Sequence, residues 1–114
     1  MDDNQPTPIA CNLGALDAEG RARRAALAAR VMSLVTDVHE RADGYALRLD
    51  PTAEASREAL EWFLLEHRCC PFLRLEVVLE PDPGSLWLRL SGGPGVKEFL
   101  AQAGLAARAA ASAG

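Results

Sequence analysis

The chain has 114 residues, of which 49% are hydrophobic and 25% are charged, and its formal net charge is −4. A chain of this length is expected to form one domain whose core needs neither disulfides nor metals. The acidic balance argues against nucleic acid as a partner, because binding to a phosphate backbone requires a basic surface.

The start of the chain contains no signal for export or for a membrane. Residues 1–8 are acidic and rich in proline, unlike the basic and apolar start of a secretory signal. No apolar run approaches the roughly 20 residues that cross a bilayer. We therefore expect a cytoplasmic protein that has no membrane partner.

The first third of the chain predicts one long helix preceded by irregular structure. Residues 1–7 predict a disordered lead, and residues 8–13, which include Cys11, predict an edge strand or an extended arm. A helix is expected over residues 16–35, where small and apolar side chains follow helical spacing. Asp17 is suited to accept hydrogen bonds from the free amide groups at the start of this helix.

A hairpin and a second helix follow. The hairpin is expected over residues 36–50, with its turn at Asp43-Gly44, because this pair tolerates the positive φ angles of a tight turn. Residues 50–70 give the clearest helix prediction. Pro71 ends this helix, because a residue before proline avoids helical angles.

The last third of the chain predicts a second hairpin and a short helix. Leucines alternate along residues 72–80 and 86–90, and the proline- and glycine-rich residues 81–85 predict the turn between these strands. A short helix is expected within residues 92–106. The alanine-rich tail, residues 106–114, is expected to fray.

Together these elements predict an α+β fold, with a single domain over residues 8–105. The expected architecture is a two-layer sandwich in which two hairpins form a mostly antiparallel four-stranded sheet, and three helices cover one face. An additional N-terminal strand would extend the sheet. The uncovered face is expected to be partly wet, because it carries the polar or amphipathic side chains of Arg74, Glu76, Trp87 and Arg89.

The chain has three cysteines, and two of them are adjacent where the second helix meets the second hairpin. These two are Cys69 and Cys70, whereas Cys11 belongs to the N-terminal segment. A cytoplasmic location and an odd number of cysteines argue against a disulfide framework, so we expect free thiols or a bound ligand. If the N-terminal segment folds back over the end of the second helix, the three sulfurs meet.

Three thiolates suit a soft metal or metalloid ion such as mercury(II), arsenic(III) or copper(I), or its organic derivative. The expected role is sequestration or hand-over of the ion in resistance. Zinc is disfavoured, because it prefers four ligands from paired Cys-x₂₋₄-Cys units, which are absent. Glu66, His67 and Arg68 are candidate supporting residues. His67 and Arg68 would lower a thiol pKa, whereas the C-terminal end of a helix would raise it.

Two other functions remain open. In a cysteine-based enzyme, one cysteine attacks and a neighbour resolves, in thiol redox chemistry or in cleavage of a carbon–metal bond, with Glu66 or His67 as acid or base. A disulfide of Cys11 with Cys69 or Cys70 is sterically easier than one between the adjacent pair. In a non-catalytic interaction domain, the cysteines only pack, and an edge hairpin mediates a homodimer.

Four segments of the chain resemble a group of small, largely uncharacterised bacterial proteins: IACNL, ERADGYALRL, EHRCCPFLRLEVVLEP and WLRLSGGPGVKEFL. The resemblance covers most of residues 9–100 and implies that the three cysteines of the group correspond to Cys11, Cys69 and Cys70. It also implies an association with heavy-metal handling. Asn12 stands where the resemblance implies a hydroxyl residue, and His67 where it implies an arginine.

Overall fold

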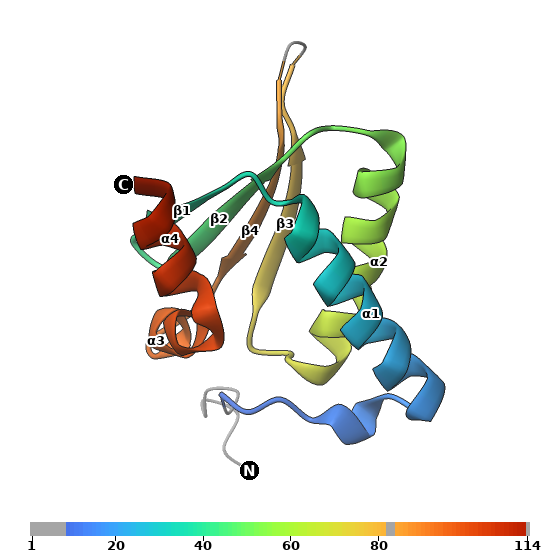
Figure 1. Ribbon diagram of the computed structural model, residues 1–114. Coiled ribbons are helices and arrows are strands. Elements are labelled where there is room, and N and C mark those ends of the chain that lie inside the picture. The colour runs from blue at the N-terminus through green and yellow to red at the C-terminus, as the bar shows by residue number, and fades with distance from the viewer. Residues whose placement is uncertain (1–8, 82–83, 114) are drawn as a thin grey trace.

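The computed structural model (Figure 1) describes residues 9–81 and 84–113 of the chain. The predicted lead at residues 1–7 and the centre of the predicted turn at residues 81–85 lie outside the described residues. The elements in chain order are a 3-10 helix Leu13–Ala15, α1 Ala18–Leu34, β1 Asp37–Arg41, β2 Gly44–Leu49, α2 Ala53–Cys69, β3 Arg74–Leu79, β4 Leu86–Ser91, α3 Val96–Leu100, a kinked segment Ala101–Leu105 and α4 Ala106–Ala113.

The four strands form one antiparallel sheet in the order β1-β2-β4-β3. In its centre, Tyr45 pairs with Leu90 and Leu47 pairs with Leu88, so the apolar faces of β2 and β4 coincide. Figure 1 shows the pairs α1–α2 and α3–α4 in front of the same side of the sheet. This arrangement confirms the predicted two-layer α+β sandwich.

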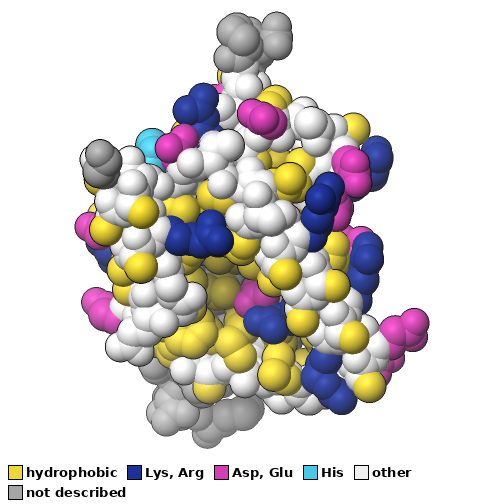
Figure 2. All heavy atoms as spheres, viewed as in Figure 1, with side chains coloured by type: hydrophobic (Ala, Val, Ile, Leu, Met, Phe, Trp, Pro, Cys, Tyr) yellow, Lys and Arg dark blue, Asp and Glu magenta, His cyan; other side chains and the backbone are white. Residues whose placement is uncertain are grey.

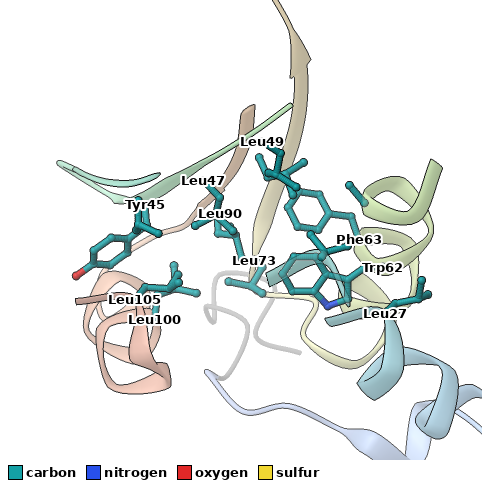
Figure 3. Packing of buried hydrophobic residues seen from close by; sticks show 14 of the residues in the cluster. Leu27, Tyr45, Leu47, Leu49, Trp62, Phe63, Leu73, Leu90, Leu100 and Leu105 are labelled. Carbon is teal, nitrogen blue, oxygen red and sulfur yellow. The ribbon is translucent and has the colours of Figure 1, made fainter. Parts of the chain in front are cut away.

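The core lies between the sheet and the helices, and both layers contribute its large side chains (Figure 3). Leu47 and Leu88 are fully buried, and Leu27 of α1 and Phe63 of α2 belong to the same cluster. On the helical side, the surface is hollowed between the two helix pairs, and hydrophobic side chains line the hollow (Figure 2). The packing therefore leaves an accessible space next to the core.

The predicted turn residues of the first hairpin are wrong by one position. Ala42 and Asp43 form the loop, and Gly44 is the first residue of β2, paired with Arg41. Gly44 does not have a positive φ angle. The glycine is needed for space instead, because the backbone of β4 approaches it closely.

The alanine-rich tail does not fray, contrary to our expectation. Residues 106–113 form α4, which packs against β1 and adds a fourth helix. Gly104 kinks the chain between α3 and α4 with a φ of 111°, a conformation that favours glycine. The backbone N–H of Val38 donates to Ser112 Oγ at 2.9 Å, and Arg108 Nη1 donates to the Met32 carbonyl at 3.3 Å.

The N-terminal segment is an arm rather than an additional strand. Within the described part of this segment, Ile9 to Asn12 have no strand partner, and a single 3-10 turn, Leu13–Ala15, follows. The side chain of Asn12 caps this turn by accepting a hydrogen bond from the Gly14 N–H at 3.1 Å. The backbone N–H of Asn12 donates to the carbonyl of Cys69, so the arm is hydrogen-bonded to the end of α2 and not to the sheet.

The uncovered face and the edge of the sheet are partly exposed. The four residues predicted to lie on the uncovered face are exposed or half-buried, as expected: Arg74, Glu76, Trp87 and Arg89. On the edge strand β3, Leu79 is 62% exposed and Val77 is 37% exposed. A homodimer through this edge stays a prediction. Among the described helices, none has the length and apolar composition to cross a membrane.

The close approach of β4 to Gly44 gives a stability prediction. A Cβ atom at position 44 would lie 2.8 Å from Ser91 Cα, so Gly44→Ala is expected to lower the free energy of unfolding by about 1–3 kcal/mol. Gly93→Ala is the matched control, because nothing lies within 4 Å of its added Cβ. Urea denaturation of both variants measures the difference, and equal effects would contradict the packing.

Candidate thiol and metal site

Cys69 and Cys70 lie at the C-terminal end of α2, and both side chains are 0% exposed. Cys69 is the last residue of the helix, and Cys70 is its C-cap, whose backbone N–H donates to the Glu66 carbonyl at 2.7 Å. Pro71 prevents the helix from continuing, as predicted. The chain therefore leaves the helix with two sulfurs enclosed where the helix meets β3.

The N-terminal arm crosses the end of α2 and is hydrogen-bonded there. The Asn12 N–H donates to the Cys69 carbonyl at 2.6 Å, which satisfies one of the free carbonyls at the helix end. Arg68 Nη2 donates to the Ala15 carbonyl at 3.3 Å. The predicted supporting residue Arg68 thus holds the arm, and these bonds bring Cys11 to the adjacent pair.

Cys11 and Cys70 form a disulfide between residues 59 positions apart in the sequence, with a Cα–Cα distance of 4.5 Å. Cys69 is a free, buried thiol whose Sγ lies 3.8 Å from Cys70 Sγ. The expectation of free thiols or a bound ligand is therefore wrong for Cys11 and Cys70, whereas a disulfide of Cys11 with one of the adjacent cysteines, which the sequence left open, is present. The physical reason for the disulfide is the docking of the N-terminal arm on the end of α2. The number of cysteines in the sequence does not predict this docking.

Glu66 is buried beside the sulfurs and is held by residues from two helices. Its Oε1 accepts from Arg24 Nη2 at 2.9 Å, and its Oε2 accepts from Trp62 Nε1 at 3.1 Å. Cys70 Sγ lies 3.5 Å from the same Oε1. A buried carboxylate needs such partners, because an unpaired charge in the interior is costly.

Sequence reasoning missed Arg24 and Trp62. The spacing of four residues between Trp62 and Glu66 on one helix is a signal that could have identified the tryptophan. No comparable signal marks Arg24, because the guanidinium reaches Glu66 from α1, 42 positions away. Only the packing of α1 on α2 brings these groups together.

Potential metal ligands gather at this position. Among the described residues, atoms of Glu66, Cys69 and Cys70 lie within 4.8 Å of one another, and all three residues are buried. Cys11 is not part of this group, and Cys70 becomes available as a ligand only when its disulfide is reduced. The group could then hold a metal ion. His67 does not belong to it and is exposed, so the structure gives no support to a ligand role for this histidine.

Burial raises the pKa of the Cys69 thiol, and the nearby positive charge of Arg24 opposes this effect. Glu66 adds to the increase in pKa. In keeping with a neutral thiol, Cys69 Sγ is placed to donate to the Glu66 backbone carbonyl at 3.5 Å. Cys69 is therefore a poor nucleophile near neutral pH, because the thiolate is the reactive form.

A scan against models of protein families, a search of curated proteins and a search of solved structures found no match to this chain. We therefore infer a function from the arrangement of these side chains.

The raised pKa of Cys69 predicts an alkaline transition. The neutral thiol stabilises the fold fully below the unfolded-state pKa, and this contribution is lost as the pH rises through the higher folded-state pKa. The ultraviolet thiolate band of the oxidised native protein, measured as the difference from Cys69→Ser, should appear at higher pH than in denaturant. A transition at the same or a lower pH in the native protein would contradict this environment.

Proposed function

We propose that the protein, once its disulfide is reduced, binds one soft metal or metalloid ion through Cys11, Cys69 and Cys70. The observation that carries this proposal is a run of sulfur contacts, here called the sulfur cluster: Cys11 is bonded to Cys70, and Cys70 Sγ lies 3.8 Å from Cys69 Sγ. Two thiolates bound to one ion, with metal–sulfur distances of about 2.3 Å, are separated by about 3.8–4 Å. The adjacent pair already has this spacing.

The composition of the cluster favours mercury(II), arsenic(III) or copper(I). Thiolates select soft ions, and three sulfurs match a trigonal site. Glu66 is a less available ligand, since each of its carboxylate oxygens already accepts a hydrogen bond. A tetrahedral zinc site would need a fourth donor in its place.

The electrostatic surroundings suit thiolates that form only when an ion arrives. Before binding, burial keeps Cys69 neutral. A bound cation deprotonates its coordinating thiols, and the resulting negative charge lies near the Arg24 guanidinium. The hydrogen bond to Glu66 raises the pKa of Arg24, so this positive charge is retained.

The disulfide must first be opened by a reductant, for which we name a dithiol. The dithiol transfers two electrons and two protons to the Cys11–Cys70 bond and becomes a disulfide itself. The products are two thiols beside that of Cys69. A reducing cytoplasm supplies such dithiols, and the role that fits is sequestration or hand-over of a toxic ion, in line with the resemblance to proteins associated with heavy metals.

A cysteine-based enzyme is the second candidate, and a specific observation favours it. A free thiol 3.8 Å from a disulfide sulfur has the arrangement of a thiol–disulfide exchange pair. Against it, the attacking thiol would be Cys69, whose pKa is raised and whose side chain is 0% exposed. Repeated turnover of a disulfide or organometallic substrate, rather than uptake of one equivalent, would identify this function.

Titration of the reduced protein with mercury(II) tests the proposal. In the absence of oxygen, the ultraviolet band of mercury–thiolate bonds should saturate at one ion per chain. In competition with a small thiol, Cys11→Ala, Cys69→Ala and Cys70→Ala should each weaken binding at least about 100-fold, since even residues that only support metal ligands contribute 10- to 100-fold.

His67→Ala is the matched control, because His67 is exposed on the same helical turn and lies outside the cluster. This variant should bind mercury(II) as the unmodified protein does. The proposal would be refuted if the mercury–thiolate band were absent, or if the three cysteine variants bound mercury(II) as tightly as the unmodified protein.

A further inference from the structure

A cavity of about 210 Å³ lies beside the sulfur cluster, on the helical side of the sheet. It corresponds in position to the hollow between the two helix pairs, where hydrophobic side chains lie inside and an acidic and a basic side chain meet at the margin (Figure 2). Figure 3 shows Leu100 and Leu105 on one side of this region and Trp62 on the other. Both helix pairs therefore contribute to one enclosure.

The lining of the cavity is asymmetric. One part is formed by polar or sulfur-containing groups from the site described above: Cys11, Arg24, Trp62 and Glu66. The other residues that line it are apolar and include Leu47, Leu73, Leu90, Leu100 and Leu105. A ligand in this cavity would thus have a thiol-reactive end near Cys11 and an apolar end among the leucines.

The charged groups of the cavity offer little to a freely ionic ligand. Arg24 and Glu66 pair with each other at 2.9 Å, so their charges largely compensate. An ion that retained its charge in these apolar surroundings would be poorly solvated. A neutral complex with an apolar substituent fits the enclosure better.

We infer that the site takes an organometallic cation of the phenylmercury(II) type. Its metal is bound by the sulfur of Cys11, and its organic group lies in the cavity. This inference rests on the proposed function and names its substrate class. The volume supports it, because an engineered apolar cavity of about 150 Å³ holds benzene. A cavity of about 210 Å³ accommodates a phenyl ring.

The binding step exchanges ligands on the metal and leaves the carbon–metal bond intact. After a dithiol has reduced the disulfide, a cysteine thiol releases its proton to the buffer, and its sulfur bonds to mercury. The acetate or chloride that accompanied the metal leaves as an anion. The product, phenylmercury thiolate, is neutral, so its burial avoids most of the cost of burying a charge.

A comparison of phenylmercury(II) acetate with methylmercury(II) chloride tests the inference on the reduced full-length protein. Each compound is distributed between the protein and glutathione, which corrects for the intrinsic affinity of the metal for a thiol. We expect the protein to favour the phenyl compound about 10- to 100-fold more than glutathione does, which is the gain from burying an aromatic ring. A corrected ratio near one would overturn the inference.

A variant at the edge of the cavity provides a second test. Ala103 lines the cavity but is exposed, so Ala103→Trp is expected to reduce the phenyl preference at least about 5-fold while mercury(II) binding is unchanged. Ala107→Trp is the matched control, because Ala107 is exposed and outside the lining. Equal phenyl preference in both variants would contradict the assigned location.

The two proposals fail in different ways. If mercury(II) binds at one ion per chain but the phenyl preference is absent, the cavity has no role and the proposed function stands. If neither mercury(II) nor phenylmercury binds to the reduced protein, both proposals are wrong.

Discussion

The docking of the N-terminal arm across the end of α2 is the constraint on which the candidate site depends. The bond from the Asn12 N–H to the Cys69 carbonyl, at 2.6 Å, and the bond from Arg68 to the Ala15 carbonyl fix the arm without a strand partner. The bond from Asn12 also satisfies the Cys69 carbonyl, which would otherwise be free at the end of α2. As a consequence, Cys11 from the start of the chain is bonded to Cys70, beside the free thiol of Cys69.

The buried carboxylate beside this cluster connects the site to the core. Glu66 accepts from Arg24 of α1 and from Trp62 of its own helix, so this ion pair links the packing of α1 on α2 to the position of the sulfurs. Removal of the half-buried Arg24 would leave the buried Glu66 carboxylate without its countercharge, which is more costly than the loss of an exposed pair. The guanidinium also provides the positive charge that favours a thiolate at Cys69.

The layers of the fold could be predicted from the sequence, because they follow from the periodicity of the apolar residues and from prolines that end helices. Alternating leucines predicted β4, and Pro71 marked the end of α2. The tail was different, since its alanines have no apolar stripe that predicts packing, and α4 is held by contacts with β1 that only the folded chain provides. The role of Gly44 was likewise misjudged, because the backbone that approaches it belongs to β4.

The site could be predicted only in part, and for a similar reason. The adjacent cysteines and Glu66 lie on one helical turn, so local spacing indicated them. His67 lies on the same turn but faces solvent, whereas Arg24 comes from another helix and was missed. The meeting of Cys11 with Cys70 required the arm to fold back, which the sequence permitted without specifying it.

The coordination number of a bound ion tests the central claim most directly. X-ray absorption spectroscopy at a mercury edge, on reduced monomeric protein loaded with one mercury(II) per chain, counts the atoms bonded to the metal. Our account predicts three sulfur atoms as neighbours, all from one chain. Two sulfur neighbours in a linear arrangement, or coordination completed by nitrogen or oxygen in place of the third sulfur, would contradict it.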